Sequence, residues 1–189
     1  MMAVLKAAWW GVKARSPEAT VLMPSLAFRP SRYAMELGFN GLSSWTDGLN
    51  IHFYGWEADF PDFLAHHRWF ARAIGLDAPV WITEVGWLRL PDTGSDDPSQ
   101  RVRQAAFHER LMALSHAAAV DRHFVFSLTP YSEAGNDMSL TDPDGTWRPA
   151  MDSMVAMARM LQSAQPRWQW VHVPTGERIG LVFEESEGG

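Results

Sequence analysis

Apolar residues follow two spacings along this chain, and stretches of the two kinds alternate. Short runs rich in β-branched and aromatic residues predict strands, whereas apolar residues three or four positions apart predict amphipathic helices. The predicted strands are residues 20–27, 49–54, 80–84 and 123–128. The predicted helices are an N-terminal stretch that ends before Pro17, residues 32–37, a stretch over 63–74, a stretch over 99–118 and residues 149–161.

One helix lies between each predicted strand and the next, so the strands are expected to form a parallel sheet with right-handed crossovers. An open doubly wound sheet and part of an eight-stranded βα barrel both fit this order, and a complete barrel needs about 250 residues. The tail over 168–183 predicts two further strands around a turn at 174–177. The pattern therefore predicts an α/β fold followed by a β-hairpin.

Three polar side chains fall at the carboxyl ends of neighbouring predicted strands, the edge where both architectures place their chemistry. Glu84 ends its apolar run just before a turn glycine, and His52 and Tyr54 stand two residues apart, so they share one strand face. Each also has a plain structural explanation: a Glu that leaves the core beside Arg89, a buried histidine and a packed ring. Asp47 precedes its strand and, at about 3.3 Å per residue, lies about 20 Å from Tyr54. This position predicts that Asp47 has a role in a turn or at the start of the strand.

Composition narrows the classes of partner. The 189 residues carry a formal net charge of −6 and no basic run, which argues against nucleic acid or an anionic membrane as partner. No apolar run is long enough for a transmembrane helix, and the absence of cysteine leaves the compartment open. The ten tryptophans suit a carbohydrate ligand, because sugar rings stack on aromatic faces. Trp9, Trp10 and Trp69 are predicted to be structural, and Trp56 and Trp87, which follow strand ends, to line a site.

Other enzyme chemistries find little support in the sequence. His66 and His67 are adjacent and diverge on a helix, and no His-Glu-x-x-His pattern occurs, so neither a metal site nor another cofactor is predicted. A serine nucleophile would call for a Gly-x-Ser-x-Gly elbow, which is absent. The first strand-to-helix turn lacks the glycine-rich fingerprint of a dinucleotide site.

The segments 47–54 and 79–87, joined by a helix, resemble strands six and seven of the retaining glycoside hydrolases of clan A, the cellulase-like βα barrels. Residues 99–100 and 144–150 resemble the openings of that family's seventh and eighth helices, so the resemblance covers roughly residues 19–161. By this resemblance Glu84 is the nucleophile, Tyr54 orients it and His52 binds substrate. Trp56 and Trp87, which follow strand ends, are expected as further substrate contacts. The family usually has an indole at the end of strand eight, so the resemblance implies either that Tyr131 replaces it as a substrate contact or that the sugar platform is weakened.

The same resemblance chooses between the two architectures. It implies the carboxyl-terminal half of a glycoside hydrolase (β/α)8 TIM barrel, about strands 5–8 with their helices, over residues 1–165. Residues 166–189 would then form a β-hairpin appendage. The implied activity is hydrolysis of O-glycosidic bonds in a carbohydrate by a retaining mechanism, with no cofactor and no metal.

One family feature is missing. A retaining glycosidase needs an acid/base carboxyl about 5 Å from its nucleophile, and the family places it in an Asn-Glu pair that occurs nowhere in this sequence. The chain alone is therefore expected to be inactive, and to need an N-terminal half-barrel or self-association. Otherwise the inward face with Val80 and Ile82 beneath Glu84 would stay uncovered. The alternative function is that of a degenerate or carbohydrate-binding barrel fragment.

The loop over 88–98 is expected to form a wall of the site.

Overall fold

The computed structural model describes residues 1–87, 98–133, 136–173 and 176–185. The chain forms two compact units. The first contains residues 1–85 and 120–125, and the second contains residues 86–119 and 126–189. None of the helices within the described residues combines the length and the apolarity needed to cross a bilayer.

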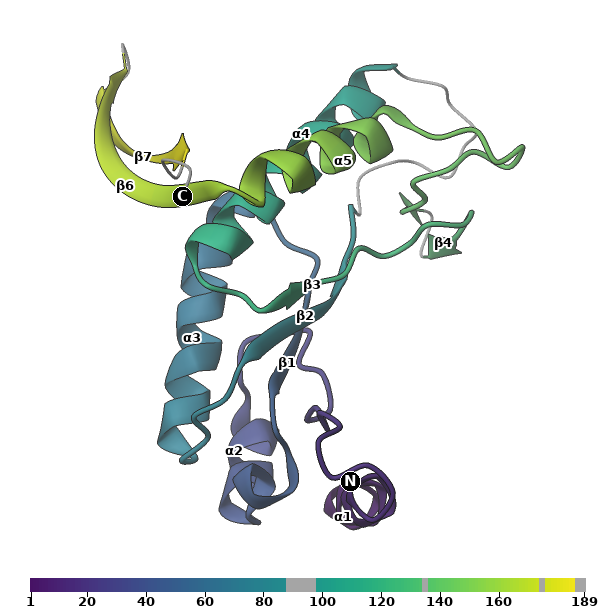
Figure 1. Ribbon diagram of the computed structural model, residues 1–189, viewed down its shortest axis with the longest axis vertical. Coiled ribbons are helices and arrows are strands. Elements are labelled where there is room, and N and C mark those ends of the chain that lie inside the picture. Colours follow the sequence, from purple (N-terminus) through teal and green to yellow (C-terminus); the bar gives the residue numbers. More distant parts are fainter. Residues whose placement is uncertain (88–97, 134–135, 174–175, 186–189) are drawn as a thin grey trace. The chain divides into compact units, whose positions relative to one another are not determined.

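The first unit is built on a parallel sheet, and Figure 1 shows its strands side by side. Its described strands are β1 (Leu49–Phe53), β2 (Val80–Val85) and β3 (Arg122–His123), in that order across the sheet. Its helices are α1 (Met2–Lys13), α2 (Arg32–Phe39) and α3 (Phe60–Ala73), with single 3-10 turns η1 (Leu42–Trp45) and η2 (Glu57–Asp59). Because α3 links the parallel neighbours β1 and β2, it is the crossover helix that the sequence predicts.

The core of this unit lies between α3 and one face of the sheet. Alternate residues of β1 and β2 are buried on that face: Leu49, Ile51, Phe53, Val80, Ile82 and Val85. Phe53 packs its ring against Phe60 and Phe63 of α3, with ring centroids 5.2 and 5.1 Å apart. The opposite face of β1 carries the half-buried polar residues Asn50 and His52.

The predicted strand over 20–27 pairs with β1 in parallel, but only through isolated bridges. Met23 donates its N–H to Gly48, and Leu26 donates to Asn50. Pro24 lies between them and has no N–H to donate, so a continuous ladder cannot form there. The predicted parallel order is present, and its first strand is irregular.

The predicted strand over 123–128 is much shorter than expected. Phe124 still donates its N–H to Ile82, but the N–H of Ser127 goes to Met138 instead. Leu140 returns a hydrogen bond to the carbonyl of Ser127. The backbone therefore leaves the sheet after residue 124 because it pairs with the segment around residues 138–140.

The second unit contains the helices α4 (Pro98–Ala117) and α5 (Pro149–Leu161), which pack against each other. Its strands are the short antiparallel pair β4 (Ser132–Glu133) and β5 (Asn136–Asp137), and the hairpin β6 (Ala164–Val173) and β7 (Gly176–Glu185). The hairpin is the antiparallel pair predicted from the tail, and Figure 1 shows β6 as a long curved ribbon.

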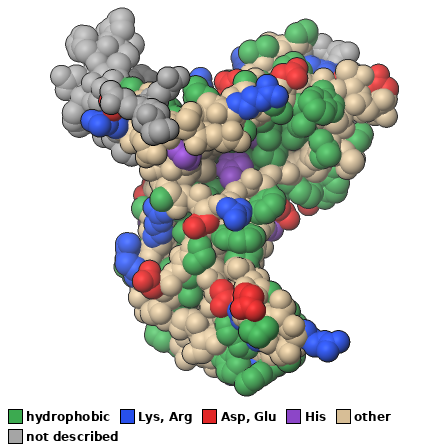
Figure 2. All heavy atoms as spheres, viewed as in Figure 1, with side chains coloured by type: hydrophobic (Ala, Val, Ile, Leu, Met, Phe, Trp, Pro, Cys, Tyr) green, Lys and Arg blue, Asp and Glu red, His purple; other side chains and the backbone are tan. Residues whose placement is uncertain are grey.

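Two of the tryptophans predicted to be structural, Trp10 and Trp69, have side chains that are mostly exposed. Trp10 is 65% exposed on α1, a helix that buries only Leu5, and Trp69 is 57% exposed on α3. Position 69 falls outside the buried stripe of α3, which follows residues 60, 63, 64, 67, 70 and 71. Figure 2 shows hydrophobic side chains on the surface at the end of this unit where α1 and α2 lie.

Candidate functional site

Three of the predicted site residues meet at the carboxyl ends of β1 and β2. Tyr54 donates its hydroxyl hydrogen to Oε2 of Glu84 at 2.5 Å, and Nδ1 of His52 lies 3.1 Å from the same oxygen. The side chain of Glu84 is 32% exposed and that of His52 18% exposed, so the carboxylate is accessible from solvent. The convergence expected from strand geometry is confirmed, whereas the chemical roles of these residues stay predictions.

The two oxygens of Glu84 have different surroundings. Oε2 receives both contacts, one from Tyr54 and one from His52. Among the described residues, Oε1 has no hydrogen-bond partner. Within the part of the chain that the structure describes, the carboxylate is therefore anchored through Oε2 alone.

An irregularity in β2 turns Glu84 toward this site. Ile82 pairs with Ile51, but the next pair joins Glu84 to His52, so Thr83 is one extra residue in the ladder. Without it, Glu84 would share the face of Val80 and Ile82, because side chains alternate along a strand. The bulge places Thr83 and Glu84 in succession on the polar face.

The bulge also corrects an expectation about the sheet. Val80 and Ile82 were predicted to lie on the inward face beneath Glu84 and to stay uncovered. They are instead 5% and 0% exposed and belong to the core on the opposite face. The face that carries Glu84 is polar and aromatic, and the ring of Trp81 on it contacts Arg122 and Phe124 of the neighbouring segment.

A row of polar groups that the sequence interpretation missed lies behind the site. Thr83 donates its hydroxyl hydrogen to Oδ1 of Asn50 at 2.6 Å, and Nε2 of His52 lies 2.9 Å from the same hydroxyl oxygen. Asn50 donates from Nδ2 to the carbonyl of Met23 at 3.2 Å. A signal for Asn50 was present, because it stands two residues before His52 and so shares its strand face.

Two of the predicted substrate contacts are accessible, each in its own unit. Trp56 follows β1 in the first unit and is 55% exposed. Tyr131 belongs to the second unit and is 40% exposed, with its ring edge-to-face against Phe126 at 4.9 Å. The hydroxyl of Ser139 accepts the backbone N–H of Tyr131 at 2.7 Å, so this backbone position is held by a side chain.

Trp87, the remaining predicted substrate contact, lies in the interior of the second unit. Its side chain is 4% exposed, and its ring packs against Phe107 of α4 with centroids 5.0 Å apart. A sugar platform needs an open aromatic face, so this burial does not fit the predicted role. The core contact with α4 accounts for the residue.

Asp47 has the strand-start role that its position predicts. Its Oδ2 accepts the N–H of Val21 at 2.8 Å and lies 2.8 Å from Nζ of Lys13. Its own N–H is donated to the carbonyl of Val21 at 2.7 Å. The carboxylate thus joins the start of β1 to the neighbouring segment and to α1.

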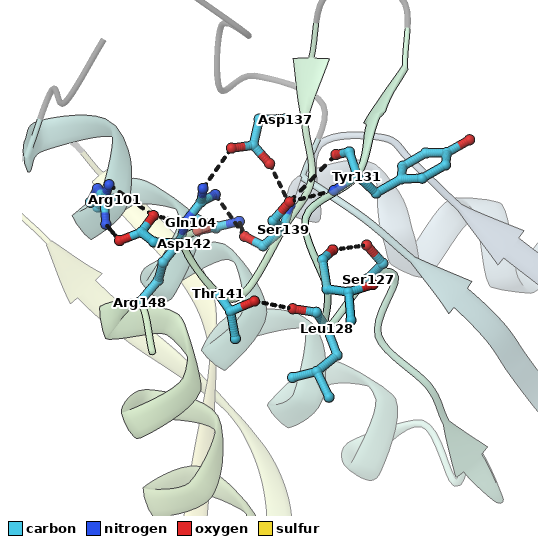
Figure 3. A network of polar contacts seen from close by, with 11 residues as sticks. Arg101, Gln104, Ser127, Leu128, Tyr131, Asp137, Ser139, Thr141, Asp142 and Arg148 are labelled. Atoms are coloured by element: carbon cyan, nitrogen blue, oxygen red, sulfur yellow. Dashed lines mark hydrogen bonds and ion pairs between the residues drawn. The ribbon is translucent and has the colours of Figure 1, made fainter. Parts of the chain in front are cut away.

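A second polar cluster, shown in Figure 3, organises the second unit around Arg148. The guanidinium is almost fully buried and donates to Asp142 at 2.9 Å, to Asp137 at 2.6 Å and to the carbonyl of Ser139 at 2.8 Å. Arg101 of α4 adds two hydrogen bonds to Asp142, at 2.7 and 3.0 Å. Despite partial burial, the hydrogen bonds from Arg148 and Ser139 lower the pKa of Asp137, and those from Arg101 and Arg148 lower the pKa of Asp142.

Within the described residues, no group of three or more His, Asp or Glu side chains is arranged to hold a metal ion. The loop over 88–98 was predicted to form a wall of the site, and its residues 88–97 lie outside the described residues.

The sequence model of a family described as glycosyl hydrolase catalytic core matches residues 31–153, well over half of the chain. The match includes β1, β2 and the residues that meet at their carboxyl ends. No curated protein matches the chain in sequence.

Solved structures of carbohydrate-active enzymes share the fold. A glucosidase from Croceicoccus marinus superposes with a TM-score of 0.68 at 17% identity, over 94% of this chain and 37% of its own. An endo-β-1,3-glucanase from Amycolatopsis mediterranei, in complex with laminarihexaose, gives 0.56 at 18% identity, over 79% and 62%. An endo-1,4-β-xylanase from Caldicellulosiruptor owensensis gives 0.54 at 17% identity, over 80% and 53%. The chain is thus a mixed α/β structure that resembles glycosidase TIM barrels and spans only part of their length.

Proposed function

Because this chain belongs to the glycosyl hydrolase catalytic core family, we propose that it forms the carboxyl-terminal half of a (β/α)8 glycosidase barrel and supplies the nucleophile of a retaining site. Residues 1–165 would make up that half, and residues 166–189 a hairpin appendage. The parallel order of β1, β2 and β3, with α3 as crossover, supports the barrel architecture.

The observation that carries the proposal is the asymmetric environment of Glu84. A carboxylate nucleophile needs one oxygen free to attack and a fixed orientation. Tyr54 and His52 both hold Oε2, and Oε1 is left without a partner among the described residues. In the proposed reaction Oε1 attacks the anomeric carbon while the glycosidic C–O bond breaks, and water later cleaves the ester and restores the carboxylate.

The proton for the leaving oxygen must come from elsewhere in this account. Retaining glycosidases carry their acid/base about 5 Å from the nucleophile, and the Asn-Glu pair that bears it in the clan A barrels is absent from this sequence. We therefore expect no turnover of aryl β-glucosides or β-xylosides by the chain alone. Turnover that disappears in Glu84→Gln would show that a carboxyl within the chain serves as the acid.

The substrate class follows from the neighbours by analogy. One of them acts on β-1,3-glucans and another on β-1,4-xylans, by their names. We propose a β-linked oligosaccharide as the ligand, with His52 contacting a sugar hydroxyl and Trp56 of the same unit as an aromatic contact. The side chain of Trp56 has the exposure that such a contact needs.

A covalent probe tests the nucleophile without needing the acid. In a dinitrophenyl fluoro-β-glucoside, fluorine replaces the hydroxyl next to the anomeric carbon, and the dinitrophenolate leaves without protonation. We expect the intact mass of the chain to increase by one fluoroglucosyl group, and Glu84→Gln to remain unlabelled. Glu36→Gln is the matched control, because Glu36 is an exposed carboxylate of the same unit that pairs with Arg32. Equal labelling of Glu84→Gln and the wild-type chain would refute the assignment.

The carbohydrate-binding alternative is favoured by the absent Asn-Glu pair. It predicts a different outcome of the same experiment. A folded chain that binds laminarihexaose, measured by tryptophan fluorescence, but takes up no label would be a binding fragment and not half of a catalytic site.

A further inference from the structure

The polar row behind Glu84 fixes the position of hydrogens that the distances alone do not show. The row runs from the carbonyl of Met23 through Asn50, Thr83 and His52 to Oε2 of Glu84. Every neighbouring pair lies within hydrogen-bond distance, from 2.6 to 3.2 Å. Each member has a limited number of hydrogens to donate, so one end of the row constrains the other.

The orientation of Asn50 sets the direction of the row. A carbonyl oxygen can only accept, so the group of Asn50 that faces Met23 must be the amide NH₂. The amide oxygen of Asn50 then faces Thr83 and can only accept its hydroxyl hydrogen. A threonine hydroxyl has one hydrogen, and that hydrogen is now used. Thr83 must therefore accept from Nε2 of His52, and Nε2 carries a hydrogen.

The hydrogen on Nε2 determines what His52 can offer to Glu84 through its other ring nitrogen, Nδ1. With a hydrogen on Nε2, a neutral imidazole would present the bare lone pair of Nδ1 to a carboxylate oxygen 3.1 Å away. Two lone pairs at that distance repel, so a proton must lie between Nδ1 and Oε2. A hydrogen bond of this kind with a charged partner is about twice as strong as a neutral one.

We propose that Asn50 and Thr83 are positioning residues that lock the hydrogen on Nε2 of His52, so that His52 and Glu84 share one proton between Nδ1 and Oε2. The shared proton and the hydroxyl of Tyr54 together hold Oε2 and leave Oε1 as the oxygen that can attack. The catalytic meaning of this lock rests on the proposed function, whereas the lock itself rests on the hydrogen bonds alone.

Nitrogen NMR of the histidine rings in the full chain tests the lock directly, because protonated and bare ring nitrogens have very different chemical shifts. At pH 8, where an ordinary histidine is neutral, we expect Nε2 of His52 to be protonated in the wild-type chain. In Asn50→Leu the hydroxyl of Thr83 becomes free to donate to Nε2, so Nε2 should lose its hydrogen and the ring should keep only the proton at Nδ1. Thr83→Val, which keeps the shape and removes the hydroxyl that accepts from Nε2, should also leave the ring with a proton at Nδ1 alone.

Thr83→Ser is the matched control, because it keeps the hydroxyl and should keep the wild-type pattern. The ring signals of the buried His67, which lies between the carbonyls of Phe63 and Phe28, report whether each variant is folded. A wild-type His52 with bare Nε2, or an unchanged pattern in Asn50→Leu with His67 intact, would overturn the proposal.

The two proposals fail in different ways. Labelling of Glu84 by the fluoroglucoside without the expected ring pattern would leave the nucleophile assignment standing and remove the lock. The expected ring pattern without labelling would leave the lock as a structural feature and remove the catalytic assignment.

Discussion

Arg148→Met should destabilise the second unit more than any other single replacement of a charged residue described above. The side chain of Arg148 is only 6% exposed and forms ion pairs with Asp137 and Asp142 as well as a hydrogen bond to the carbonyl of Ser139. Methionine fills a similar volume but removes every donor. The carboxylates, 25% and 21% exposed, then remain partly buried with fewer partners.

The size of this destabilisation depends on the hydrogen bonds that Asp137 and Asp142 keep when Arg148 is replaced. Removing one member of a buried ion pair costs about 3–5 kcal/mol. Asp142 keeps both hydrogen bonds from Arg101, and Asp137 keeps the N–H of Ser139 at 2.8 Å. The lower end of the range, about 3 kcal/mol, is therefore expected for Arg148→Met. Arg148→Lys keeps the charge without the planar fork and should lose about half as much.

Urea unfolding followed by circular dichroism measures this loss. With a slope of about 1–3 kcal/mol per molar urea, 3 kcal/mol corresponds to a midpoint lower by about 1–3 M. Arg159→Met, on an exposed position of α5, is the matched control and should shift the midpoint little. The same midpoint in Arg148→Met and Arg159→Met would show that Arg148 stabilises the folded chain no more than an exposed arginine does.

The pH dependence of this variant has a definite sign. The pKa values of Asp137 and Asp142 are lower in the folded chain than the ordinary 3.8. Their contribution to stability is therefore fully present above pH 3.8 and is lost as the pH falls through the lower folded values. The difference between the wild-type chain and Arg148→Met should shrink in that acid range and stay constant from pH 5 to 7.

Three further predictions concern the first unit. Burial lowers the pKa of His123 to about 4, so the free energy of unfolding should fall by up to about 3 kcal/mol as the pH drops from 6.5 to 4. In His123→Gln the free energy of unfolding should depend less on pH, and urea midpoints measured across this pH range would check it. A Cβ on Gly38 would lie 2.3 Å from Cγ2 of Ile74, so Gly38→Ala should lower the free energy of unfolding by about 1–3 kcal/mol. A Cβ on Gly11 would meet nothing within 4 Å, so Gly11→Ala should raise it by about 1 kcal/mol. Equal melting temperatures of these two variants would contradict the packing around Gly38. In a complete barrel that contains this chain, Glu84→Gln should abolish turnover of an aryl glycoside and leave the melting temperature nearly unchanged, because it alters little volume; wild-type turnover would exclude Glu84 as the nucleophile.

Local patterns predicted the elements that depend on local chemistry. The strand over 80–84, the helix over 149–161 and the hairpin all have composition and turn signals of their own, and the structure contains each of them. His52 and Tyr54 were expected to share one face from the period of a strand alone, and both contact Glu84.

Features that depend on a partner segment were not visible in the sequence. The bulge at Thr83 arises from the register between β2 and β1, and it reversed the expected face of Val80 and Ile82. Trp87 follows a strand end, as a ligand-binding aromatic often does, but Phe107 of α4 covers its ring. Burial of an aromatic residue is decided by tertiary contacts, which composition and spacing do not encode.

The cluster around Arg148 was missed for a related reason. The residues of this cluster come from α4, from β5 and from the segment between β5 and α5, so no short motif joins them. The role of Asp142 as an acceptor for two arginines follows only from the fold.

In the proposed mechanism Glu84 attacks through Oε1 while Tyr54 and His52 hold Oε2. The decisive measurement is a crystal structure of the chain after reaction with the dinitrophenyl fluoro-β-glucoside. We expect an ester between the anomeric carbon and the oxygen of Glu84 that does not contact Tyr54 and His52. An ester on another carboxylate, or through the oxygen that those two residues hold, would exclude this mechanism.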